Sequence, residues 1–130
     1  MIAVDSSALL AIALKEAERN AFADVIGTNH CLIGAVTVLE SHMVLRERVG
    51  AEGVEYIDGL LARPHVELIG FDYELLPLAR LAFDRYGKGR HRAGLNFGDC
   101  MAYAVAKFHD VPLLFKSDDF RLTDIRAALP

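Results

Sequence analysis

The chain lacks any long uninterrupted run of apolar residues, and this excludes several classes of protein. It has 130 residues, and none of its apolar stretches is long enough to span a bilayer. Its first residues, Met1 to Asp5, lack the basic start and the long apolar core of a secretory signal. We therefore expect a cytoplasmic protein that does not associate with membranes.

Cysteine is scarce as well. Only Cys31 and Cys100 are present, and neither lies in a CxxC pair or at zinc-ligand spacing from a histidine. In a reducing compartment, such cysteines are usually small buried side chains. The sequence therefore favours two buried thiols over a zinc site.

An overall excess of positive charge is also missing. The net charge is −4, which argues against binding nucleic acid through the whole surface. One segment differs, because residues 85–98 contain no acid but include Lys88, Arg90 and Arg92. A charged loop is often merely solvated, yet a local basic segment can contact phosphates even in an acidic protein. We expect these three side chains to hold a nucleic-acid backbone.

Short apolar strands alternate with helices along the chain. We predict strands at 2–4, 31–33, 66–69 and 111–115, with a candidate fifth edge strand at 125–129. Helices are expected at 8–14, 16–26, 37–49, 54–62, after Asp72 and at 97–108. Pro77 either kinks the helix after Asp72 or marks a later start. The alternation predicts one α/β domain over residues 1–130, with a mostly parallel sheet of four to five strands between two layers of helices.

Two acids occupy corresponding places in this predicted sheet. Asp5 ends the first strand, and Asp118 follows the fourth. Sites in parallel sheets lie outside the carboxyl ends of the strands. If the first and fourth strands are neighbours, Asp5 and Asp118 should therefore meet.

Each acid of the predicted site also has a purely structural explanation. Asp5 suits a helix N-cap, and Asp118 with Asp119 suits the start of a turn. Two capping boxes are expected, one from Thr37 to Glu40 and one from Asn96 to Asp99. Taken singly, the structural role of each acid is at least as probable as a functional one.

The shared placement of the acids favours a metal site. Asp5, Glu40, Asp99 and Asp118 all lie at strand ends or helix N-termini with largely apolar flanks. Crowded carboxylates repel one another unless a cation neutralises them, and Mg²⁺ or Mn²⁺ prefers such oxygen ligands. A bound divalent ion activates water for hydrolysis of a phosphodiester. In this hypothesis Asp5 and Asp99 are the principal ligands, Glu40 and Asp118 complete or orient the metal-water shell, and the Ser7 hydroxyl supports the network.

Other phosphate-handling folds fit poorly. No glycine-rich loop follows the first strand, so neither a P-loop nor a dinucleotide fingerprint is present. A phosphatase of the haloacid dehalogenase type needs Asp-x-Asp after that strand, but Ser7 occupies the second position. A receiver domain needs an acid directly after the third strand, where Gly70 and Phe71 stand instead.

Several segments resemble the PIN-domain ribonucleases of the VapC toxin family, in order and over essentially the whole chain. The matching segments are Ile2–Leu9 (IAVDSSAL), Val38–Glu40, Tyr86–Cys100, Leu113–Phe120 and Thr123–Ile125. The resemblance implies that Asp5, Glu40 and Asp99 bind a divalent metal together with a fourth acid. Asp118 is preferred over Asp119 for that place because it lies nearer the strand end.

The resemblance has further implications for partners. It implies a homodimer, inhibition by a VapB-type antitoxin and a bacterial or archaeal origin. Asn96 matches a recurrent position assigned to capping or metal-water contacts, and Ser117 stands where family members often have glycine.

The alternative is a catalytically silent PIN-like module that only binds RNA or protein, but all the expected acids are present. The number of metals and the identity of the RNA stay open.

Overall fold

A computed structural model describes residues 1–130, and its centre is a sheet of four parallel strands. The strands are β1 (Ile2–Val4), β2 (Cys31–Gly34), β3 (Val66–Ile69) and β4 (Leu113–Leu114), in the order β3-β2-β1-β4. β1 and β4 are therefore neighbours, with Val4 beside Leu114, so the condition for the acids after these strands to meet is fulfilled. The candidate fifth strand is reduced to a single bridge between Leu113 and Ala127.

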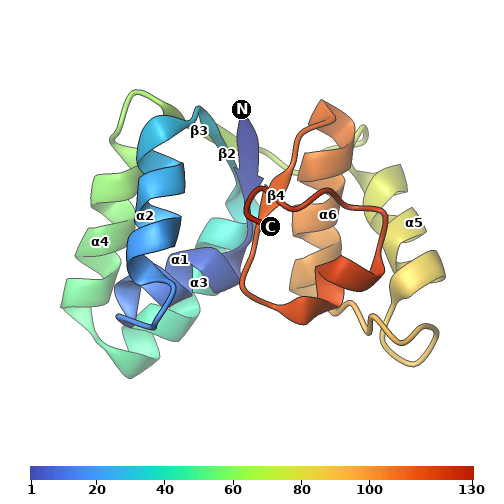
Figure 1. Ribbon diagram of the computed structural model, residues 1–130, viewed down its shortest axis with the longest axis horizontal. Coiled ribbons are helices and arrows are strands. Elements are labelled where there is room, and N and C mark those ends of the chain that lie inside the picture. Colours follow the sequence, from blue (N-terminus) through green and yellow to red (C-terminus); the bar gives the residue numbers. More distant parts are fainter.

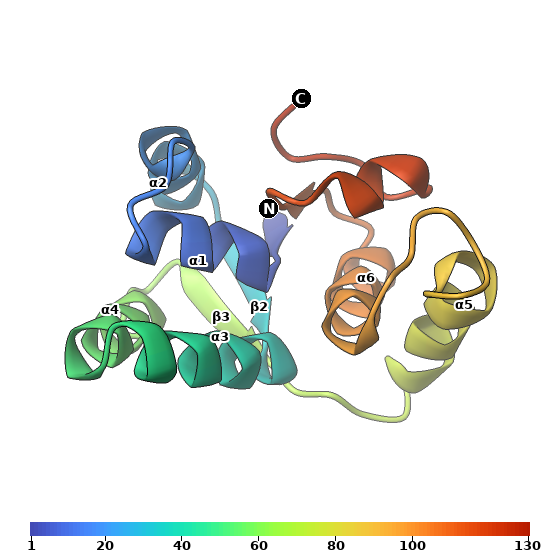
Figure 2. The same ribbon diagram turned by 90° about the horizontal axis from the view of Figure 1, so that it is seen from below.

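Helices cover both faces of the sheet, so the three-layer α/β prediction is confirmed. One side carries α1 (Ser6–Ala13), α2 (Arg19–Thr28), α3 (Ala35–Arg48) and α4 (Ala51–Leu61). The other carries α5 (Leu76–Tyr86), α6 (Phe97–His109) and the short 3-10 helix η1 (Asp118–Leu122). Figures 1 and 2 show the two groups of helices on opposite sides of the strands. No helix combines the length and the apolar character that crossing a membrane requires.

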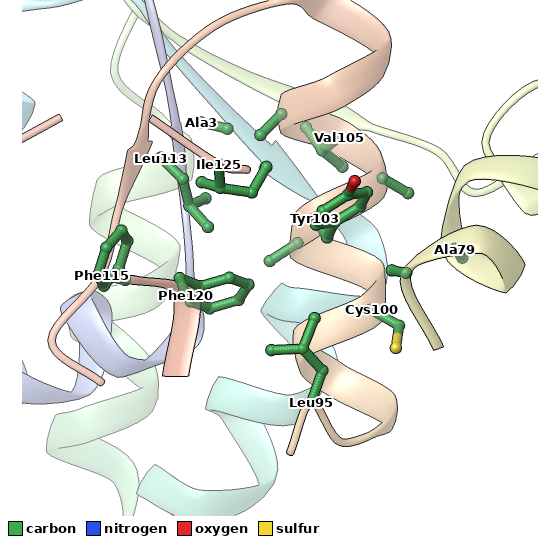
Figure 3. Packing of buried hydrophobic residues seen from close by; sticks show 14 of the residues in the cluster. Ala3, Ala79, Leu95, Cys100, Tyr103, Val105, Leu113, Phe115, Phe120 and Ile125 are labelled. Carbon is green, nitrogen blue, oxygen red and sulfur yellow. The ribbon is translucent and has the colours of Figure 1, made fainter. Parts of the chain in front are cut away.

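Alternating strand residues supply the two cores between these layers. Ile2 and Val4 of β1 pack toward α1 and α2, whereas Ala3 packs toward α6. Opposite orientation of successive side chains is inherent to a strand, and here both faces are buried, so β1 is apolar throughout. Figure 3 shows the core on the α6 side, where Tyr103, Phe115 and Phe120 come together.

The predicted start of α3 was wrong, whereas α5 has the later start that Pro77 allowed. α3 begins at Ala35, two residues earlier than expected, with Gly34 as an N-cap that has no side-chain oxygen. The capping box predicted for Thr37 and Glu40 is therefore absent, and Thr37 is buried inside the first turn. Asp72 caps a turn through the backbone amides of Glu74 and Leu75, and α5 starts later, with Pro77 in its first turn.

Candidate active site

The carboxyl ends of the strands form the edge of the sheet where the acids gather. This edge lies at the lower end of Figure 1, together with the start of α6 and the loop that precedes it. Asp5 leaves β1 there, and its backbone amide donates to the carbonyl oxygen of Leu114 in β4 at 2.9 Å. The strand order therefore places the end of β1 directly beside the segment that carries Asp118 and Asp119.

Asp5 is the most buried acid of the chain, with only 2% of its surface exposed. Its Oδ2 accepts hydrogen bonds from the Ser7 hydroxyl at 2.6 Å and from the Ser7 backbone amide at 3.1 Å, so Asp5 caps α1 as predicted. Its Oδ1 is buried and has no hydrogen-bond partner. A buried carboxylate oxygen without a partner is costly in free energy, which indicates that a further group is needed at this position.

Burial also changes the acidity of Asp5. Removal from water raises its pKa from the ordinary value of 3.8 to about 7, against the lowering effect of the two hydrogen bonds from Ser7. The charges of Asp99 and Glu40 raise the pKa further. No basic side chain acts in the opposite direction. No side chain of the protein therefore compensates the negative charge of the acids around Asp5.

Asp99 reaches the same site from the first turn of α6. The capping box predicted for Asn96 and Asp99 is present, since each side chain accepts a hydrogen bond from the backbone amide of the other, at 2.9 and 3.0 Å. Burial raises the pKa of Asp99, the bond from Asn96 lowers it, and the charges of Asp119 and Glu40 raise it again. The structural and the functional explanations of Asp99 are thus compatible, because one oxygen caps the helix while the carboxylate faces other acids.

Glu40 lies against the start of α6 because position 98 is glycine. A Cβ atom built at Gly98 would overlap the Glu40 carboxylate. The close approach of α3 to α6 therefore depends on the absence of a side chain at this position. Gly98 is a site residue that the sequence interpretation missed, and its only indication was a glycine beside an acid at a helix start.

The two adjacent acids after β4 are placed very differently. The side chain of Asp118 is 97% exposed, and it forms an ion pair with Arg121 at 4.0 Å. Asp119 is partly buried, and its charge acts on Asp99. The sequence favoured Asp118, which lies nearer the strand end, but of the two acids it is Asp119 whose charge acts on Asp99.

Ser7 joins the first strand to the last. Its hydroxyl donates to Asp5 and accepts a hydrogen bond from the backbone amide of Lys116 at 2.9 Å. The side chain of Lys116 turns away, to Glu16 at 3.2 Å and Glu18 at 3.4 Å. Ser7 thus fixes one oxygen of Asp5, while the Lys116 side chain is engaged with Glu16 and Glu18.

The basic loop leads directly into Asn96 and the start of α6 (Figure 1). Lys88 and Arg92 are exposed, and neither takes part in a salt bridge. Arg90 is more restrained, since its Nε donates to the carbonyl oxygen of Asp84 and its guanidinium lies 5.8 Å from the centre of the Phe83 ring.

The acids fit a hard divalent cation in their chemistry. They supply oxygen ligands, one buried oxygen of Asp5 lacks a hydrogen-bond partner, and their negative charges repel one another. No three acidic, histidine or cysteine side chains are spaced as a complete ligand set. Mg²⁺ does not require such a set, because it usually binds one or two carboxylates and keeps several of its waters.

Comparison with known proteins identifies the family. The PIN domain model matches residues 2–126. A ribonuclease VapC of Mycolicibacterium smegmatis is 42% identical over 125 residues, covering 95% of this chain and 97% of that protein. Ribonuclease VapC30 of Mycobacterium tuberculosis is 41% identical and covers 98% of both chains. The chain therefore belongs to the PIN-domain family, and within it to the VapC ribonucleases.

Solved structures at lower identity show the same fold. The VapC20 toxin of Mycobacterium tuberculosis, described as cleaving the sarcin-ricin loop, superposes with a TM-score of 0.79 at 16% identity and covers 96% of both chains. VapBC2 of Rickettsia felis, solved with a DNA fragment from its promoter, gives a TM-score of 0.71 at 16% identity and covers 98% of this chain and 96% of that chain.

Proposed function

We propose that this chain is a metal-dependent ribonuclease, the toxin of a VapBC-type pair, which acts on RNA in the cytoplasm. One observation carries the proposal: the unpartnered Oδ1 of buried Asp5 lies in a site whose other acids, Asp99 and Glu40, raise its pKa. A site that concentrates negative charge in this way serves a cation. The VapC ribonucleases that share about 40% of its residues supply the reaction class.

In this proposal each side chain has a distinct task. Asp5 and Asp99 hold Mg²⁺ or Mn²⁺, which when bound activates water and neutralises charge on the phosphodiester. Glu40 and Asp119 would orient the water, and one of them would accept its proton as the water oxygen bonds to phosphorus. The P–O bond to the leaving ribose oxygen would break, and that oxygen would take a proton from solvent. Ser7 keeps Asp5 oriented, and Asn96 does the same for Asp99.

Metal removal tests this proposal directly. Purified protein is incubated with RNA in the presence of Mg²⁺, Mn²⁺ or excess EDTA. We expect cleavage with either metal and none with EDTA, and addition of metal in excess of the chelator should restore it. Cleavage that persists in EDTA would overturn the proposed mechanism, and a chain that only binds RNA would support the silent-module alternative.

The adjacent acids of η1 provide a matched pair of variants. Asp119→Asn should weaken metal-dependent cleavage by about tenfold or more, as loss of a group next to a metal ligand commonly does. Asp118→Asn removes the same charge from a neighbouring but exposed position, and we expect less than a twofold change. Initial rates measured over a range of Mg²⁺ concentrations distinguish the two. The reverse ranking would restore Asp118 as the fourth acid.

The basic loop should contribute to RNA affinity and little to chemistry. Lys88→Ala and Arg92→Ala should each weaken RNA binding and lower the slope of log affinity against log salt by about 0.7, the value for one phosphate contact on a single strand. Arg63→Ala removes the same charge at the opposite edge of the sheet, before β3, and is the control. Equal effects from Arg63→Ala would show that only overall charge matters.

Protein partners are proposed from an apolar surface beside the acids. It consists of exposed side chains from α3, α5 and α6: Leu39, Met43, Leu76, Phe83 and Phe97. Phe97 is 73% exposed and separates two pockets of about 400 and 280 Å³. Apolar surface of this extent is typical of protein contacts. We propose a homodimer and a VapB-type antitoxin as partners; a chain that sediments as a monomer at all concentrations would contradict the dimer.

A further inference from the structure

The C-terminal segment after η1 is attached to α6 by one polar cluster. The hydroxyl of Tyr103 donates to Oδ1 of Asp124 at 2.8 Å, and Nζ of Lys107 donates to Oδ2 of the same carboxylate at 2.9 Å. Tyr103 is completely buried, so its hydroxyl depends on this acceptor. The cluster lies away from the carboxyl edge of the sheet and takes no part in the proposed chemistry.

Both ends of this connection lead to acids of the site. Tyr103 lies one helical turn after Asp99 on α6, and residues four apart occupy the same face of a helix. Asp124 follows Asp119 by five residues in the C-terminal segment. The hydrogen bond from Tyr103 to Asp124 therefore joins the helix that carries Asp99 to the segment that carries Asp119.

Hydrogen bonds within the short segment between Asp119 and Asp124 restrain its backbone. A displacement of Asp124 should therefore also displace Asp119. The hydroxyl of Thr123 donates to the carbonyl oxygen of Phe120 at 2.7 Å and accepts from the backbone amide of Ile125 at 3.2 Å. Phe120 is fully buried, 5.2 Å from the ring of Phe115 at the end of β4. Figure 3 shows Phe120 and Ile125 in the same core as Tyr103.

We propose that Asp124 is a positioning residue of the active site, which through its hydrogen bond with Tyr103 sets the approach of Asp119 to Asp99. This inference rests on the proposed function, since it assigns to Asp124 an effect on metal binding. The side chain of Asp119 makes no hydrogen bond or ion pair with α6, and its backbone amide donates to the Ser117 hydroxyl at 3.2 Å. Without the hydrogen bond to Asp124, η1 would still be held by the buried Phe120, but the chain after η1 would no longer be attached to α6 at Tyr103.

Tyr103 stays protonated and Asp124 stays ionised near neutral pH. Burial raises the pKa of Tyr103, and the hydrogen bond to Asp124 raises it further, so the hydroxyl remains a donor. Partial burial acts to raise the pKa of Asp124, but the bonds from Lys107 and Tyr103 lower it overall. Neither group therefore changes its protonation state near neutral pH, and the hydrogen bond between Tyr103 and Asp124 is not a pH-dependent switch.

The test compares metal binding with stability in the full chain. We expect Asp124→Ala and Tyr103→Phe each to weaken Mn²⁺ binding, measured by titration calorimetry without RNA, by several-fold to about tenfold, the range for groups beyond the ligands themselves. Asp124→Asn keeps an oxygen acceptor for Tyr103 and should bind Mn²⁺ as the wild type does. The same ranking should appear in the Mn²⁺ concentration that gives half-maximal cleavage.

Arg126→Ala is the matched control, because it also loosens the C-terminal segment. Arg126 donates to the carboxylate of Asp110 at 3.1 Å and to its carbonyl oxygen at 2.8 Å, beyond the end of α6 and on the surface. A drop in thermal midpoint with unchanged Mn²⁺ affinity is expected for it. The same pattern in Asp124→Ala would reduce Asp124 to a stabilising residue and overturn the inference.

A double-mutant cycle separates action through Asp119 from a general effect. If Asp124 acts through Asp119, Asp124→Ala should cause no further loss of Mn²⁺ affinity in an Asp119→Asn background. An equal loss in both backgrounds would overturn the inference. Wild-type protein that binds no Mn²⁺ and cleaves no RNA would instead overturn the proposed function, so the two failures are distinguishable.

Discussion

Asp99→Asn should abolish metal-dependent RNA cleavage without unfolding the protein. The substitution removes the charge that holds the cation but keeps an oxygen that accepts the hydrogen bond from the Asn96 backbone amide, so the capping box and α6 persist. The stabilisation of charge by a bound metal amounts to several kcal/mol, which corresponds to a loss of about 10²- to 10³-fold in rate. Cleavage rates at saturating Mg²⁺ and circular dichroism check the two halves of this expectation.

The control for Asp99→Asn lies in the same turn of the helix. Asn96→Ser retains a side-chain oxygen for the backbone amide of Asp99 without adding charge, and Ser is as good an N-cap as Asn. It should change stability little and leave cleavage within an order of magnitude. If Asp99→Asn folded and cleaved RNA at the wild-type rate, Asp99 would have only its structural role, and the metal site would have to be built from other acids.

The parallel sheet and the placement of acids at its carboxyl edge were predictable from the sequence, because strand ends and helix caps are specified by neighbouring residues, whereas the adjacency of β1 and β4 was only a condition of the prediction. A three-residue apolar strand followed by Asp5 and a capping serine specifies where β1 ends. Parallel pairing then brings all carboxyl ends to one edge. The Asn96–Asp99 capping box was predictable for the same reason, since both partners lie within one helical turn.

What could not be predicted depended on contacts between distant segments. A glycine cap starts α3 earlier than Thr37 suggested, because packing of the buried Thr37 outweighed its capping preference. The choice between Asp118 and Asp119 required the direction of η1, which is set by the burial of Phe120. Gly98 mattered only once α3 was known to cross the start of α6.

The second large effect expected is a pH-dependent instability of the metal-free protein that originates at Asp5. Because burial raises the pKa of Asp5 from 3.8 to about 7, the native state holds this proton more tightly than the unfolded chain between these values. Stability contributed by the protonated form is thus fully present below about pH 4 and is lost as the pH rises to about 7. The shift corresponds to on the order of 4 kcal/mol in the free energy of unfolding.

Asp5→Asn isolates this contribution, because asparagine accepts from Ser7 but does not titrate. Measured by urea unfolding with EDTA, the stability of wild type relative to Asp5→Asn should fall steadily from pH 4 to pH 7.5. Other carboxylates cancel in this comparison, apart from Asp99 and Glu40, whose charges interact with Asp5. Parallel pH profiles for the two proteins would show that Asp5 is not held protonated in the metal-free native state.

Addition of metal should reverse the instability in the wild type alone. A ligand that binds only the native state at 100 times its dissociation constant adds about 2.7 kcal/mol to the free energy of unfolding. At pH 7.5, saturating Mn²⁺ should therefore recover much of what ionisation of Asp5 costs, whereas Asp5→Asn should gain far less. Equal stabilisation of both proteins would place the bound metal away from Asp5. Since the same buried oxygen causes the instability and would receive the cation, the cost in stability and the capacity for catalysis would have one origin.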